Sequence, residues 1–132
     1  MRLLQLFLVG MAVLPGCASH WALTGGAGVP AAAGQACTKV GDNGNTRVDL
    51  KVEHLALPER VSAGASVYVV WAQADSSAPT NIGALVVGKR LDGELHTTTP
   101  LQSFTLSVTP ELSSTVVQPS GPIVLSGRIT AR

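Results

Sequence analysis

The chain has 132 residues, of which 45% are hydrophobic, 13% charged and 4% aromatic. This length favours a single domain of modest size. Nine Lys and Arg residues against eight Asp and Glu residues give a formal charge of +1. That balance argues against the clustered basic face of a nucleic-acid-binding protein and against a polybasic membrane patch. Two cysteines are too few for a disulfide-dense scaffold or a multi-cysteine zinc module.

The first 16 residues have the pattern of a secretory signal peptide. Met1-Arg2 gives a short positive start, and residues 3–14 form an almost wholly apolar run that ends at Pro15-Gly16. A membrane-spanning helix needs about 20 apolar residues. The shorter run fits the hydrophobic region of a signal peptide, so we expect residues 1–16 to be cleaved off.

Leu14-Pro15-Gly16-Cys17 resembles the lipobox of bacterial lipoproteins, in which an aliphatic residue, a small residue and Gly or Ala precede an invariant Cys. Pro15 stands where the pattern usually has Ala, Ser or Thr. The resemblance implies that the Cys17 thiol is acylated, that cleavage occurs before Cys17, and that the new amine is usually acylated too. Two or three acyl chains anchor a protein stably, whereas one gives marginal, reversible binding.

The residue after the lipidated Cys influences sorting in envelopes with two membranes. Ala18 is not the Asp that the resemblance associates with inner-membrane retention, so it favours the outer membrane. The alternatives are an ordinary signal peptide, cut after Ala18 or Ser19, and an uncleaved anchor.

Residues 17–45 are expected to hold the lipidated Cys17 and a flexible tether. Gly, Ala and Pro dominate from Ala18 to Asn45 without a sustained period, and such a composition buries too little apolar surface to offset the entropy of ordering. A linker of this kind spans roughly 30 Å on average. Trp21 would lie at the bilayer interface or pack loosely on the domain. The alternative is that the segment belongs to the fold, with an extra edge strand at about 35–40.

Cys37 raises a question of cysteine pairing. If Cys17 is lipidated, Cys37 has no partner within the chain and is a free thiol or pairs between molecules. If Cys17 is not lipidated, a Cys17–Cys37 disulfide becomes possible.

From Thr46 onward the pattern changes to one of strands. Residues 47–53 and 102–109 alternate between apolar and polar side chains, which is typical of strands with one buried face. Residues 67–73 are mostly β-branched and aromatic, as in a central strand. Asp92-Gly93 predicts a two-residue hairpin.

About seven strands bounded by turns fit into residues 46–132. This spacing predicts an all-β fold, an antiparallel β-sandwich of the immunoglobulin or fibronectin type III kind. Trp71 is the expected core anchor, packed on Phe104.

Residues 45–130 also resemble an Ig-like domain of bacterial envelope proteins of acidobacterial type. The resemblance implies a fold and a compartment, and it brings no catalytic residue with it. Its carrying residues are Asn45-Thr46-Arg47-Val48, Val67-Tyr68-Val69-Val70-Trp71, Asn81-Ile82-Gly83, Thr97-Thr98-Thr99-Pro100-Leu101-Gln102-Ser103-Phe104 and Val117-Gln118-Pro119-Ser120.

Residues that carry chemistry are few and scattered. His20, His54 and His96 could be combined with Cys37, but no pair has the tight spacing of zinc motifs. The segment 64–68 around Ser66 lacks the final Gly of a nucleophile elbow and precedes a strand. We therefore expect no catalytic residue, no cofactor and no metal site, and Cys17 is the one predicted site, for lipidation.

The sequence thus predicts a non-enzymatic, lipid-anchored envelope protein. It would contact the membrane through its lipid and present the β-sandwich to a protein partner or fill a structural role, without binding nucleic acid. The alternative is a small-ligand or carbohydrate-binding module that uses loops at one end of the sandwich. Sugar sites usually stack on exposed aromatic rings, so burial of Trp71 beside Tyr68 and Phe104 would weigh against that alternative.

Overall fold

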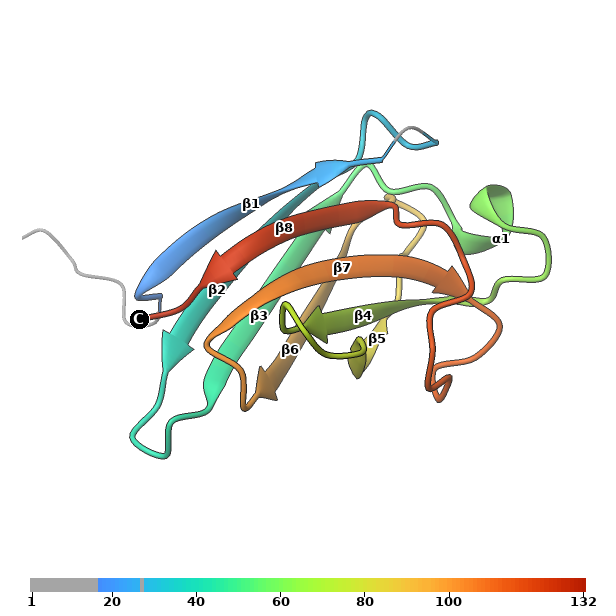
Figure 1. Ribbon diagram of the computed structural model, residues 1–132. Helices are drawn as coiled ribbons and strands as arrows, with labels where there is room; N and C mark the ends of the chain where they lie inside the picture. Colours follow the sequence, from blue (N-terminus) through green and yellow to red (C-terminus); the bar gives the residue numbers. More distant parts are fainter. Residues whose placement is uncertain (1–16, 27) are drawn as a thin grey trace, which may run out of the picture.

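The computed structural model describes residues 17–26 and 28–132 (Figure 1). The predicted signal peptide, residues 1–16, lies outside the described residues, as do the three lipobox residues before Cys17. None of the described helices is long and apolar enough to cross a membrane. The elements in chain order are β1 (Ser19–Gly25), β2 (Ala33–Val40), β3 (Thr46–Glu53), α1 (Pro58–Val61), β4 (Val67–Gln73), β5 (Thr80–Leu85), β6 (Gly93–Thr99), β7 (Ser103–Glu111) and β8 (Leu125–Thr130).

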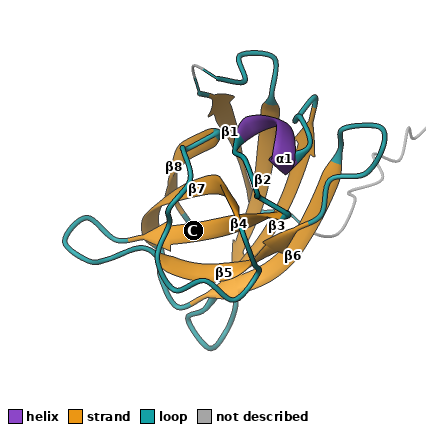
Figure 2. Ribbon diagram, turned by 90° about the vertical axis from the view of Figure 1, so that its right-hand side faces the viewer, coloured by secondary structure: helices purple, strands orange, loops and turns teal. Residues whose placement is uncertain are grey.

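All these strands belong to one sheet, in the order β5-β4-β7-β8-β1-β2-β3-β6, and every neighbouring pair is antiparallel. The sheet curls until its two edge strands, β5 and β6, approach each other (Figure 2). There, the Thr97 hydroxyl in β6 donates a 2.6 Å hydrogen bond to the Ile82 carbonyl in β5. The predicted all-β antiparallel class is confirmed. The strands form one nearly closed, barrel-like sheet in place of the two separate sheets expected of a sandwich.

The core fills the inside of the curled sheet. Side chains alternate between the two faces of a strand, and β3 shows this clearly, because Val48, Leu50 and Val52 are buried while the side chains between them are exposed or half-buried. Burial of such apolar surface is the main favourable contribution to folding. The other strands add inward-facing residues to the same cluster, among them Leu23, Ala36, Tyr68, Val70, Ala72, Leu85, Phe104, Leu106, Val108, Leu125 and Ile129.

The prediction of a flexible tether over residues 17–45 is wrong. β1 and β2 lie in the middle of the sheet, where β1 pairs with β8 and β2, and β2 pairs with β3 along its whole length. The alternative of a strand at about 35–40 is confirmed as a strand, but it is internal and not at an edge. The segment therefore belongs to the folded domain.

The inward residues of β2 explain why its pattern is faint in the sequence. Gly34, Ala36 and Thr38 are buried, and all three are small. A side chain at Gly34 would crowd the neighbouring strand, since its Cβ would lie 3.1 Å from the Cβ of Leu23. Trp21 supplies the bulk on β1, and its Nε1 donates a 2.9 Å hydrogen bond to the Thr38 hydroxyl. Trp21 is thus half-buried and packed against the core.

The hairpin predicted at Asp92-Gly93 is also wrong. β6 pairs with β3 and not with the preceding strand β5. The turn lies earlier in the chain, where the Leu91 amide donates to the Gly88 carbonyl. β5 and β6 are consequently free to occupy opposite edges of the sheet.

Trp71 is fully buried, as predicted, but on the outer face of the sheet. It lies opposite Ser107 in β7, whereas its neighbour Val70 lies opposite Val108 and belongs to the inner core. Phe104 is on that inner face, so the predicted packing of Trp71 on Phe104 is wrong. The indole Nε1 donates a 2.8 Å hydrogen bond to a hydroxyl on the same outer face, that of Thr109.

A long segment after β7, residues 112–124 and here called the strap, is fastened at both sides of β4. On β5, the side-chain amide of Asn81 donates to the carbonyls of Ser114 and Val116, at 2.9 Å each. On β7, the buried carboxylate of Glu111 accepts hydrogen bonds from the Ser120 amide and hydroxyl at 2.6 and 2.8 Å. Since β4 lies between β5 and β7, the strap crosses the outer face of β4 and forms a second, smaller core there.

We expect Trp71→Ala to lower the free energy of unfolding by about 3–5 kcal/mol, as other large aromatic truncations in cores do. Leu112→Ala in the strap is the control, because that side chain is 68% exposed and surface changes usually stay within about 0.5 kcal/mol. Chemical denaturation measures both. Equal, small shifts in the two variants would show that the strap does not bury Trp71.

We also expect a chain that begins at Gly41 not to fold. It lacks β1 and β2, so β8 and β3 each lose a neighbour in the middle of the sheet. A chain that begins at Ala18 keeps every strand and is the control. Circular dichroism should show a cooperative thermal transition in the control alone; a shared melting temperature would restore the tether interpretation.

Candidate functional site

Four neighbouring strands place chemically versatile side chains in one line across the outer face of the sheet. His20 in β1 lies opposite Cys37 in β2, Cys37 lies opposite Asp49 in β3, and Asp49 lies opposite His96 in β6. Side chains of directly opposed residues point to the same face, with Cβ atoms about 4.5–5.5 Å apart. We call this line the outer row.

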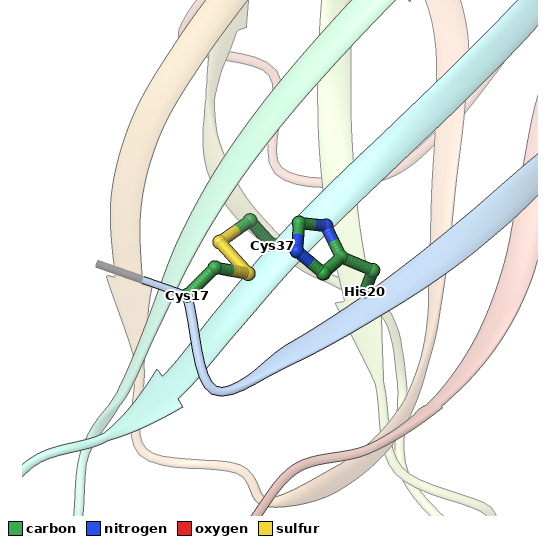
Figure 3. A group of neighbouring side chains, drawn as sticks. All are labelled: Cys17, His20 and Cys37. Carbon is green, nitrogen blue, oxygen red and sulfur yellow. A yellow bond between two sulfur atoms is a disulfide. The ribbon is translucent and has the colours of Figure 1, made fainter. Parts of the chain in front are cut away.

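A disulfide joins Cys17 to Cys37 at one end of the outer row (Figure 3). The two Cα atoms are 5.5 Å apart, a distance typical of disulfides. Cys17 lies just before β1 and Cys37 lies within β2, so the bond fastens the start of the β1–β2 hairpin. The structure thus contains the pairing that the sequence left as the alternative to lipidation of Cys17. A lipid thioether and a disulfide both use Cys17 Sγ, so one molecule carries one or the other.

His20 lies beside this disulfide (Figure 3). The sulfur atoms of Cys17 and Cys37 and a ring nitrogen of His20 lie within 4.8 Å of one another. Sequence reasoning missed this group because it depends on the register that sets His20 opposite Cys37. The other two histidines lie elsewhere. His54 follows the far end of β3, and His96 lies at the opposite end of the outer row.

Asp49 and His96 form an ion pair in the second half of the outer row. Asp49 Oδ1 lies 2.7 Å from His96 Nδ1, and Glu94 Oε2 lies 3.5 Å from His96 Nε2. The hydrogen bond to Asp49, with a smaller contribution from Glu94, raises the pKa of His96 above its usual 6.5. Arg47 Nε lies 3.3 Å from the other carboxylate oxygen of Asp49, so both oxygens of Asp49 have cationic neighbours when His96 is protonated.

A shallow hollow of about 360 Å³ opens over the outer row. Its lining includes the side chains of His20, Gln35, Cys37, Asp49 and His96. Small ions and molecules in solvent can therefore reach Cys37 and His20 directly.

The remaining residues considered for chemistry have structural positions. The Ser66 hydroxyl donates a 2.7 Å hydrogen bond to the Leu112 carbonyl at the start of the strap. Tyr68, Trp71 and Phe104 are fully buried, and Trp21 is half-buried. In the described part of the chain no Phe, Tyr or Trp side chain is fully exposed for stacking on a ligand.

Comparison with known proteins assigns no family to the chain. No protein-family model matches it, and no curated protein matches it in sequence.

We expect Asp49→Asn to lower the pKa of His96, because the variant removes the carboxylate that stabilises the protonated ring. The pair stabilises the fold below the unfolded-state pKa of about 6.5, and this contribution disappears as the pH rises through the higher folded-state pKa. NMR titration of the His96 ring protons measures the shift. Asp42→Asn, which changes an exposed acid in the β2–β3 turn, is the control and should leave the pKa of His96 unchanged.

Proposed function

We propose that the protein is a non-enzymatic envelope lipoprotein, anchored through Cys17, that presents its folded sheet to a protein partner. The observation that carries the proposal is the apolar run 3–14 followed by Leu14-Pro15-Gly16-Cys17, which has the features of a lipoprotein signal. The Cys17–Cys37 disulfide in the structure fits export, because disulfides persist in oxidising compartments outside the cytoplasm, but it belongs to molecules in which Cys17 carries no lipid.

The position of Cys17 determines how the domain would sit on the membrane. β1 begins at Ser19, so the folded sheet starts almost at the lipid and has no long tether. The same end of the sheet holds the β2–β3 turn and the C-terminus, which lies beside the start of β1 in Figure 1. This end would face the lipid headgroups, and the outer membrane is the membrane that we propose.

The opposite end of the sheet would face the partner. The register places three connections there, because Thr24 lies opposite Ala33, Ala33 opposite Glu53, and Val52 opposite Gly93. These connections are the turn after β1, the segment after β3 that leads to α1, and residues 86–92. Val86 is 76% exposed in the last of them, so this end offers apolar as well as polar contacts.

A carbohydrate-binding module is the alternative, and burial of the aromatic residues weighs against it. Tyr68, Trp71 and Phe104 are fully buried, so their rings are not offered to a sugar. The hollow over the outer row is lined by imidazole, disulfide and carboxylate groups, with the Lys51 side chain beside them, and offers no Phe, Tyr or Trp ring to a sugar.

We expect Cys17→Ser to release the protein from the membrane, because the lipid thioether needs the Cys17 thiol. Cys37→Ser is the matched control, since it removes the same disulfide but keeps the lipidated sulfur. Detergent phase partition and intact mass should show Cys37→Ser in the detergent phase with the mass of the lipid. Cys17→Ser should enter the aqueous phase or accumulate uncleaved.

Equal partition of the two variants would overturn the anchor. In that case both variants and the unsubstituted protein would enter the aqueous phase. If the intact mass of the unsubstituted protein then shows an internal disulfide and no lipid, Cys17 is a structural residue. The protein would then be an exported domain without a lipid.

A further inference from the structure

We propose that the sulfur atoms of Cys17 and Cys37 and the imidazole of His20 form a copper(I) site on the outer face of the sheet. All three ligand atoms already lie within 4.8 Å of one another (Figure 3). His20 and Cys37 are held opposite each other by the pairing of β1 with β2. The two sulfurs are joined as a disulfide in this structure, so a metal ion can enter only after this bond is broken and the sulfurs move apart.

The ligand types select a soft metal. Thiolate and thioether sulfurs favour Cu(I) over hard cations, and imidazole suits copper as well. Structural zinc sites are almost always four-coordinate, and open zinc sites with three protein ligands keep a water in the fourth position. Within residues 17–26 and 28–132 this group supplies three ligands, so the zinc arm of the test below separates Cu(I) from an open zinc site. Three ligands with two sulfurs fit the low coordination number of Cu(I).

The oxidation state of Cys37 opens or closes the site. In the disulfide, neither sulfur can act as a thiolate. A dithiol reductant opens the site by supplying two electrons and two protons to the disulfide, and it leaves as its own disulfide. Binding of Cu⁺ then replaces the Cys37 thiol proton, which is released to solvent.

Lipidation of Cys17 would not close the site, and this step alone rests on the proposed anchor. The lipid converts Cys17 Sγ to a thioether, which stays a soft ligand, and it leaves Cys37 without its disulfide partner. The anchored form would thus carry an open site, and the disulfide-bonded form would carry a closed one.

The surroundings of the three ligands carry charges of both signs. Asp49 lies directly opposite Cys37 on β3, but its two oxygens face Arg47 and His96, and Lys51 also lines the hollow. The two sulfurs and the imidazole would therefore carry the binding. The hollow over the outer row gives solvent access to His20 and Cys37. His20 itself is exposed, which keeps substitutions there compatible with folding.

The test is a Cu(I) titration of the full-length protein purified in detergent. The protein is reduced with dithiothreitol, freed of reductant under nitrogen and titrated with Cu(I) against a chromophoric bicinchoninate chelator. We expect one Cu(I) per chain. Loss of a residue that only hydrogen-bonds to a metal ligand costs about 10–100-fold in metal affinity. His20→Ala and Cys37→Ser each remove a ligand itself, so each should weaken Cu(I) binding at least about 100-fold.

His54→Asn is the matched control, because it changes a histidine beyond the far end of β3 and should leave the affinity unchanged. Unlipidated protein with its disulfide intact should bind no Cu(I). Three outcomes would each overturn the copper site. They are equal affinity of His20→Ala and His54→Asn, no binding of Cu(I) by the reduced protein, and displacement of Cu(I) by equimolar Zn²⁺. Intact mass of the same sample reports lipidation separately, so failure of the anchor and failure of the metal site are told apart.

Discussion

The register of β1, β2, β3 and β6 is the constraint on which both faces of the sheet depend. A shift of β2 by one residue would turn every side chain to the other face. Ala36 and Thr38 would leave the core, while Gln35 and Cys37 would enter it. The burial of the inner face therefore fixes the partners of Cys37 on the outer face. The core and the outer row are two results of the same pairing.

The strands that the sequence predicts well are those in which large apolar residues alternate. β3 and β7 are in this group, because Val48, Leu50 and Val52 in β3 and Phe104, Leu106 and Val108 in β7 are the buried set. β2 is predicted only as an alternative, because its inward positions include Gly34 and Ala36 and a Cβ at Gly34 would lie 3.1 Å from the Cβ of Leu23. β1 is missed although Trp21 and Leu23 both face inward. Composition alone made this segment resemble a linker, although its residues alternate in burial.

Trp71 shows a second limit of sequence patterns. A continuous apolar run such as Val67–Trp71 does not reveal which alternate residues face the core. Trp71 can be buried on the outer face because the strap covers β4 there, held by hydrogen bonds to Asn81 and Glu111. The candidate site could likewise be predicted only in part. Cysteine counting suggested the Cys17–Cys37 pair, but His20 lies beside it only because of the strand register.

The approach of β5 to β6 has a consequence for contacts between copies of this protein. An open sheet exposes unpaired backbone groups at both edges, and these recruit strands from other molecules. Here each edge strand shields the other, with the Thr97 hydroxyl bonded to the Ile82 carbonyl and the Leu95 side chain set against Gly83. Neighbouring copies would then meet through side chains and loops, and edge-to-edge polymerisation would require this seam to open first.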